Sequence, residues 1–154
     1  RYFARLVEAL PEPGPHKGVL PGVQRLLEAI AARADVFPAL LTGNCEEGAR
    51  IKLQHFDLWK FFRCGAFGDA ADDRNELFDV AIARALACGA PPVRRHDVLV
   101  VGDTVLDIAC ANAAGARSVA VATGPHDIDT LQAAGADVVV RDLSDTAAFL
   151  QLLV

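Results

Sequence analysis

The sequence has no methionine, a single tryptophan and a single tyrosine, and it begins at Arg1. Because even an initiator methionine is absent, we expect these 154 residues to be part of a longer protein. The apolar runs are far shorter than the ~20 residues that cross a bilayer. Residues 1–10 are amphipathic and include Glu8, so they do not form a signal peptide. The composition therefore predicts no membrane partner.

Cysteines at metal-binding or disulfide-framework spacing are also absent. Cys45, Cys64, Cys88 and Cys110 stand about twenty residues apart, with no C-x-x-C pair. This pattern argues against a zinc site and a disulfide framework, and it favours a reducing, cytoplasmic setting. We expect the four side chains to pack as small hydrophobic groups.

A basic surface is likewise missing. The formal net charge is −5 and no stripe of lysine and arginine is visible, which argues against a nucleic-acid partner. His16, His55, His96 and His126 are scattered, and no two of them have the spacing of metal ligands. We expect these histidines to lie on the surface.

Apolar residues, by contrast, make up 53% of the chain, enough for the core of one domain. Short apolar runs alternate with segments of helical period. Strands are predicted at 36–41, 64–67, 98–101, 118–122 and 137–140, and helices at 1–10, 23–31, 45–53, 56–62, 74–88, 104–115, 127–134 and 146–153. The Pro- and Gly-rich residues 11–22 read as a linker. This order predicts an α/β fold with a mostly parallel sheet.

The stretch at residues 97–115, DVLVVGDTVLDIACANAAG, carries the first candidate site. Asp103 follows a buried strand and a Gly102 turn, and Asp107 lies four residues on, in the first helical turn. Ligands of open α/β sheets bind at this carboxyl edge, and two carboxylates suit Mg²⁺. The alternative is structural: Asp103 caps the helix, and Asp107 interacts with the helix dipole.

Thr42 ends another predicted strand and carries the second candidate site. Its hydroxyl, together with the backbone N–H groups of Gly43 and Asn44 at a helix start, would bind an anion such as phosphate. A capping box is the alternative, with Asn44 as the N-cap and Glu47 three residues later. Both roles can coexist.

The third candidate is Arg74, in the segment Asp73-Arg74-Asn75-Glu76. Asp73 is a plausible N-cap, which places Arg74 in the first helical turn, where the helix dipole mildly disfavours a cation. That cost suggests a role for the guanidinium, such as holding a phosphoryl oxygen. A solvated surface arginine is the alternative.

A D-x-D pattern at Asp127 and Asp129 is rejected as a nucleophile motif. It follows the turn at residues 123–125 rather than a buried strand end. Helix capping at the start of a surface helix is the interpretation we adopt.

Taken in order and spacing, the segments LLTGN, DRNEL and VLVVGDTVLDIACANAAGARSVAVATG resemble the haloacid dehalogenase-like hydrolase superfamily, above all its phosphoglycolate-phosphatase-like branch. The resemblance covers residues 18–154. It implies a Rossmann-like, mostly parallel sheet with helices on both faces, and residues 1–17 look like the end of a helical cap and its linker. The family's first strand is missing from the chain.

The resemblance implies a Mg²⁺-dependent phosphatase acting on a small phosphorylated metabolite through an aspartyl-phosphate. Thr42 would correspond to the phosphoryl-binding hydroxyl of motif II. Arg74 would stand at the motif III position, where lysine is commoner, so its reach and geometry differ. Asp103 would be the motif IV metal ligand, and Asp107 would support the metal or its water.

The family's motif I, D-x-D-x-T/V, would supply the nucleophile, and it is not in this chain. We therefore expect residues 1–154 alone to be inactive or nearly so. The alternatives that stay open are a non-catalytic phosphate- and Mg²⁺-binding remnant, and a phosphomutase or dehalogenase of the same superfamily. A nucleotide-binding Rossmann domain is weaker, because no G-x-G-x-x-G follows a strand. Substrate identity and oligomeric state are not readable from the sequence.

Overall fold

The computed structural model describes residues 2–12, 18–71 and 73–153. The chain divides into two compact units, one formed by Arg1–Val19 and Phe37–Gly89 and the other by Leu20–Val36 and Ala90–Val154. Part of the predicted linker (residues 13–17, with His16) falls outside the described residues. The assignment of residues 1–17 to a cap and linker and of 18–154 to a core stays a prediction.

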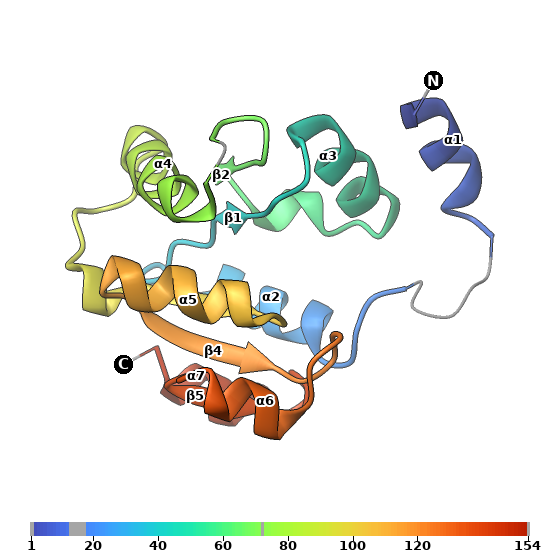
Figure 1. The fold of residues 1–154 in the computed structure, drawn as a ribbon. Coiled ribbons are helices and arrows are strands. Elements are labelled where there is room, and N and C mark those ends of the chain that lie inside the picture. The colour runs from blue at the N-terminus through green and yellow to red at the C-terminus, as the bar shows by residue number, and fades with distance from the viewer. Residues whose placement is uncertain (1, 13–17, 72, 154) are drawn as a thin grey trace. The chain divides into compact units, whose positions relative to one another are not determined.

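The first unit is built on a pair of short parallel strands, as Figure 1 shows, with helices α3 and α4 on either side. Its elements are α1 (Tyr2–Ala9), β1 (Leu40–Leu41), α3 (Glu46–His55), the 3₁₀ helix η1 (Trp59–Phe61), β2 (Gly65–Ala66) and α4 (Arg74–Ala87). The strands pair in register, Leu40 with Gly65 and Leu41 with Ala66. A Cβ on Gly65 would lie 2.7 Å from that of Leu40, so glycine permits this close pairing.

Two predictions for this unit are only partly right. The strand expected at 36–41 pairs only at Leu40–Leu41, because Pro38 has no N–H to donate to a ladder. The helix expected at 56–62 is reduced to the single turn of η1. Helix α3 ends at His55 with Phe56 as its C-cap, and the left-handed Asp57 (φ 57°) then separates α3 from η1.

The second unit is a parallel three-stranded sheet in the order β3-β4-β5. Its elements are α2 (Val23–Ala31), the 3₁₀ helix η2 (Arg95–Asp97), β3 (Leu99–Gly102), α5 (Val105–Ala114), β4 (Arg117–Val121), α6 (Ile128–Ala133), β5 (Val138–Val140) and α7 (Thr146–Gln151). Figure 1 shows α5 running alongside the central strand β4.

Side chains of β4 alternate between two hydrophobic cores. Val119 packs with Leu26, Ile30 and Phe149 of α2 and α7. Its neighbour Ala120 packs with Ile108 of α5 and Leu131 of α6. Because successive strand residues face opposite sides, these contacts place helices on both faces of the sheet. The predicted α/β fold with a parallel, Rossmann-like sheet is confirmed.

Side-chain hydrogen bonds between Ser118, near the start of β4, and Asp137, directly before β5, lock these two strands together. Asp137 Oδ2 accepts hydrogen bonds from the backbone N–H of Ser118 at 2.7 Å and from its hydroxyl at 3.0 Å. The Ser118 hydroxyl oxygen accepts in turn from the backbone N–H of Asp137 at 3.0 Å. Ser118 is only 2% exposed, so these bonds satisfy polar groups that water does not reach.

In the part of the chain that the structure describes, every helix is too short or too polar to cross a membrane.

Candidate functional site

The first candidate segment is the turn of residues 42–44, which follows β1. The backbone N–H of Thr42 donates to Ala66 O at 3.1 Å, so Thr42 continues the β1–β2 ladder. Thr42 Oγ1 accepts hydrogen bonds from the backbone N–H of Asn44 at 3.1 Å and from its Nδ2 at 3.2 Å. A threonine hydroxyl has two acceptor lone pairs and one donor hydrogen. These bonds leave the Thr42 hydrogen to donate to an anion.

Asn44 has a different role from the expected helix cap. The N-cap of α3 is Cys45, without a side-chain cap hydrogen bond. Glu47 pairs instead with Arg50 at 2.7 Å. The capping box of Asn44 and Glu47 is therefore wrong, because the Asn44 amide is already used to brace Thr42.

Lys52 reaches the same turn and was missed from the sequence. Its Nζ lies 3.5 Å from Asn44 Oδ1, at the outer limit of a hydrogen bond. Gly68 supports the turn from another strand end, because its N–H donates to Asn44 O at 2.8 Å and a Cβ there would lie 2.1 Å from Gly43 O. Lys52 could have been identified from its spacing, because it lies eight residues, or about two helical turns, after Asn44.

Arg74 is the first residue of α4, as predicted, and Asp73 is its N-cap. The Asp73 carboxylate accepts a hydrogen bond from the backbone N–H of Asn75 at 2.9 Å. Helix α4 packs on both β1 and β2. The structure therefore places Arg74 in the same unit as Thr42, and its contact with phosphate stays a prediction.

Asp103 directly follows β3 at the carboxyl end of the strand. The N-cap of α5 is Thr104, so the alternative in which Asp103 caps the helix is wrong. Within the described ranges, no hydrogen bond or ion pair engages the Asp103 carboxylate. It borders a pocket of about 150 Å³, together with Gly102, Val121 and Thr123 on the same edge of the sheet.

Gly124 lies against this carboxylate, after β4. A Cβ on Gly124 would be 2.4 Å from Asp103 Oδ2 and 2.6 Å from its Cγ. Since such approaches do not occur between real atoms, Asp103 keeps its place only because residue 124 has no side chain. Nothing in the sequence around Gly124 indicated this contact.

Asp107 is buried in the first turn of α5, with 7% of its surface exposed. Its Oδ2 accepts hydrogen bonds from the backbone N–H of Thr104 at 3.0 Å and from the Thr104 hydroxyl at 2.8 Å. Thr104 and Asp107 form a capping box. The structural alternative is therefore correct for Asp107, although a metal-supporting role remains compatible with it.

The oxygen ligands present fit a magnesium ion. Mg²⁺ is commonly bound through one or two carboxylates, while waters and substrate phosphate oxygens complete its octahedron. The Asp103 carboxylate, without a hydrogen-bond partner in the described ranges, offers such a ligand beside a pocket. No group of three histidine, cysteine or acidic side chains gathers among the residues described, so a zinc-type cage is not indicated there.

The predicted site residues fall into two pairs. Thr42 and Arg74 belong to the first unit, and Asp103 and Asp107 belong to the second. That the two pairs meet around one phosphate group stays a prediction.

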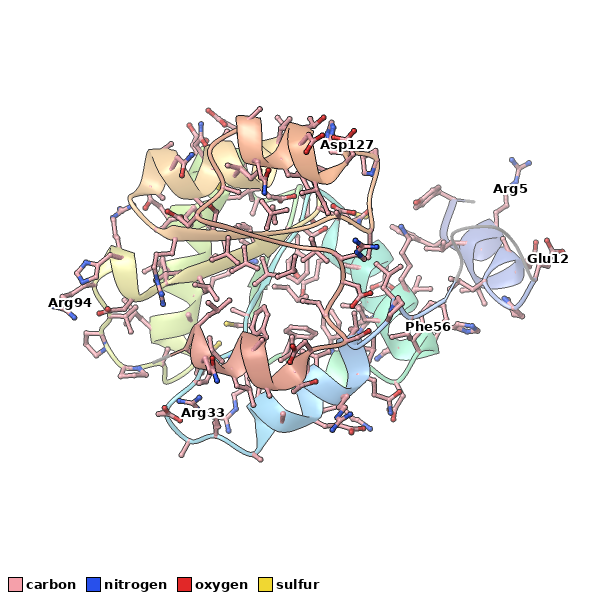
Figure 2. The ribbon with its side chains drawn as sticks, turned by 90° about the horizontal axis from the view of Figure 1, so that it is seen from below. Arg5, Glu12, Arg33, Phe56, Arg94 and Asp127 are labelled. Carbon is pink, nitrogen blue, oxygen red and sulfur yellow. The ribbon has the colours of Figure 1, made fainter. Side chains whose placement is uncertain are left out.

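The rejected D-x-D pattern behaves as a helix cap. Asp127 is the N-cap of α6 and accepts a hydrogen bond from the backbone N–H of Thr130 at 2.8 Å. Bonding to Thr130 holds the pKa of the Asp127 carboxyl below its ordinary value. Figure 2 shows Asp127 where the chain enters this helix.

The remaining histidines and cysteines follow the expectations in part. His55 and His96 are exposed and His126 is partly exposed. Cys110 is buried with 1% of its surface exposed, whereas Cys88 is exposed, so the prediction that every cysteine packs as a core residue is wrong for Cys88.

Comparison with known proteins gives a family match for part of the chain. Residues 74–146 match the family model described as HAD-hydrolase-like, so this part of the chain is similar to that family. The matched region contains α4 with Arg74, and β3 and α5 with Asp103 and Asp107.

The proteins to which this chain is similar include hydrolases. A phosphoglycolate phosphatase from Chromobacterium violaceum is 28% identical over 131 residues, which cover 84% of this chain and 55% of that protein. A hydrolase structure from Pseudomonas syringae is 28% identical with a TM-score of 0.69, over 86% of this chain and 58% of that one. The structure of a predicted phosphoglycolate phosphatase from Haemophilus somnus is 20% identical with a TM-score of 0.79, over 97% and 64% of the two chains, and supports the fold alone. The chain thus spans only about half to two thirds of the length of these relatives.

Proposed function

We propose that this chain carries the phosphate- and metal-binding part of a Mg²⁺-dependent phosphatase acting on a small phosphorylated metabolite. The observation that carries the proposal is the Asp103 carboxylate, which stands at the carboxyl end of β3, borders a pocket and has no hydrogen-bond partner in the described ranges. Ligands of α/β sheets bind at this edge. The similarity to phosphoglycolate phosphatase and to a hydrolase supports the same reaction class.

Each residue has a distinct role in this proposal. The Thr42 hydroxyl and the backbone N–H of Gly43 donate hydrogen bonds to phosphoryl oxygens. The Asn44 N–H, expected to do the same, instead donates to Thr42 Oγ1 and orients that hydroxyl. Arg74 offsets negative charge on the same group, and such electrostatic stabilisation is usually the largest single contribution to catalysis of phosphoryl transfer. Lys52 holds the Asn44 amide and adds positive charge near the turn.

Asp103 would hold Mg²⁺, and Asp107 would keep the start of α5 in place beneath it. When bound, the ion would polarise a phosphoryl oxygen and stabilise the charge that develops there. The nucleophile and the general acid/base would come from a D-x-D motif outside residues 1–154. The reaction would then pass through an aspartyl-phosphate, as the family resemblance implies.

The setting that we propose is the cytoplasm, with no nucleic-acid or membrane partner. Its support is the four free cysteines, since thiols persist in reducing compartments. The substrate class is limited to phosphate monoesters of small metabolites, with phosphoglycolate as the first to test, because that name is carried by a relative.

The test is hydrolysis of p-nitrophenyl phosphate and phosphoglycolate by the complete gene product, with and without Mg²⁺. Asp103→Asn is expected to lower kcat/KM by roughly 100-fold or more, because one preorganised charge is lost from the reacting centre. Asp127→Asn is the matched control, since the Asp127 carboxylate caps α6 and has no role in the proposed reaction. It should retain the wild-type rate.

Normal turnover by Asp103→Asn would overturn the proposal. If the wild-type protein binds Mg²⁺ and inorganic phosphate but hydrolyses neither ester, it is a non-catalytic remnant. Turnover of phosphoglycolate that is independent of divalent ions would contradict the magnesium assignment alone.

A further inference from the structure

Two cysteines far apart in the sequence meet in the first unit. Cys64 directly precedes β2, and its carbonyl oxygen accepts a hydrogen bond from the Leu40 N–H at 3.0 Å. Cys88 is the C-cap of α4. Neither residue takes part in the site proposed above.

The last turn of α4 faces the Cys64–Gly65 segment. Arg84 Nη1 donates a hydrogen bond to Gly65 O at 2.9 Å. Because residues four apart lie on the same side of a helix, Cys88 faces the segment that Arg84 contacts. Cys88 is also close enough to Cys64 to influence its ionisation. The Arg84 contact and this influence both place the two thiols near each other.

The two thiols differ in their access to solvent. Cys88 is exposed and Cys64 is partly buried. Burial, together with the neighbouring Cys88, raises the pKa of the Cys64 thiol to about 11. Reagents from solution therefore meet Cys88 first, while Cys64 is held protonated beside it.

We propose that Cys64 and Cys88 form a reversible intramolecular disulfide when the protein meets a small-molecule disulfide such as oxidised glutathione. This thiol pair is a modification site that is independent of the proposed phosphatase activity. The disulfide would covalently join the end of α4 to the start of β2, and it would close a loop of the chain that contains Arg74.

The reaction proceeds by two exchanges that balance. The Cys88 thiolate attacks glutathione disulfide, its S–S bond breaks, and one glutathione thiolate leaves. Cys64 then loses its proton to solvent and attacks the Cys88 sulfur, which releases the second glutathione. The two protein thiols are oxidised by two electrons, and one glutathione disulfide is reduced to two glutathiones.

The test is peptide mapping of the native chain after incubation with oxidised glutathione and alkylation of the remaining thiols. Trypsin should cut after Arg63, Arg74, Arg84 and Arg94, so the disulfide links residues 64–74 (CGAFGDAADDR) to residues 85–94 (ALACGAPPVR). We expect this linked pair as the main product, and we expect dithiothreitol to remove it.

Matched variants distinguish the pair from general oxidation. Cys45→Ser should still yield the linked peptides, whereas Cys64→Ser should leave a stable glutathione adduct on Cys88. If wild-type Cys88 keeps its glutathione while Cys64 remains alkylatable, or if the link forms only after unfolding in urea, the proposal is overturned. Because Cys88 is exposed, Cys88→Ser should fold, and its lack of the linked pair provides a second check.

Discussion

Oδ2 of Asp103 lies only 2.4 Å from where a Cβ on Gly124 would stand. The contact joins the residue after β3 to the loop after β4, so the position of the candidate metal ligand depends on a glycine twenty-one residues later in the sequence. A substitution at Gly124 therefore tests the metal site without removing a candidate ligand.

Gly124→Ala should weaken Mg²⁺ binding and lower stability slightly. Gly124 is not among the glycines with positive φ, so alanine fits its backbone dihedral angles. A Cβ there would lie 2.8 Å from Asp103 Cβ as well as 2.4 Å from Oδ2, so residue 103 must shift as a whole. Displacement of a positioned ligand typically lowers metal affinity by roughly 10- to 100-fold. Isothermal titration with Mg²⁺ measures the affinity, and circular dichroism measures the melting temperature.

Gly115→Ala is the matched control for that experiment. Gly115 is the C-cap of α5, with φ 70° and no atom within 4 Å of an added Cβ. Alanine there should lower stability by about 1 kcal/mol through backbone strain and leave Mg²⁺ affinity unchanged. If Gly124→Ala and Gly115→Ala bind Mg²⁺ with the same affinity, Asp103 does not bind the ion.

Gly102→Ala should lower the free energy of unfolding of the second unit, in contrast to Gly124→Ala, which acts on a candidate metal ligand. A Cβ on Gly102 would lie 2.2 Å from Cγ of Asp107, which is buried and hydrogen-bonded to Thr104. Because Asp107 is fixed there, we expect a loss of roughly 1–3 kcal/mol in the free energy of unfolding. Urea unfolding measures it, and Val101→Ala, at a half-exposed neighbouring position, should cost under ~1 kcal/mol.

Ser118→Ala should remove the lock between β4 and β5. The backbone N–H of Asp137 would lose its acceptor, and the carboxylate would lose one of its two donors. An unsatisfied buried group costs about 1–3 kcal/mol, and urea unfolding should record this loss. Gln132→Ala, on the exposed side of α6, should change stability by less than ~0.5 kcal/mol. Equal stability of the two variants would contradict the role of the lock.

Alkylation of Cys64 should depend on pH in a way that distinguishes the folded from the unfolded chain. In the folded chain, burial and Cys88 raise its pKa to about 11 from an ordinary value of 9.0. Since only the thiolate reacts, its rate with iodoacetamide should reach half of its maximum near pH 11 in the folded chain and near pH 9 in urea. The same midpoint in both states would contradict the raised pKa.

The same shift links Cys64 to stability, with a definite sign. The folded-state pKa is raised, so the stabilising contribution of the protonated thiol is complete below about pH 9 and falls as the pH rises toward 11. The alkaline loss of stability should therefore be smaller in Cys64→Ser than in the wild type.

Much of the fold was predictable because apolar periodicity is a local property. The run Val98–Val101 predicted β3 to within one residue, and α2 lies where the spacing of its apolar residues placed it. The strand expected at 36–41 was overestimated, since apolar character does not reveal which residues find a hydrogen-bonding partner. The helix expected at 56–62 failed because the left-handed Asp57 gave no local signal.

The candidate site was predictable where its residues follow strand ends. Thr42 and Asp103 were identified in this way, and the Thr104-x-x-Asp107 capping box could have been, because its pattern is written in the sequence. Gly124 and the Cys64–Cys88 pair could not, because each depends on segments that meet only after folding. The hydrogen bonds from Asn44 to Thr42, in place of a cap on α3, could not be predicted for the same reason.

The alternation of side chains along β4 has a consequence for sequence variation. Val119 packs against Leu26 and Phe149, whereas the next residue, Ala120, packs against Ile108 and Leu131. A change of volume at either position can be compensated only on its own side of the sheet. Among homologues, residues 119 and 120 should therefore covary with two separate groups of partners and hardly at all with each other.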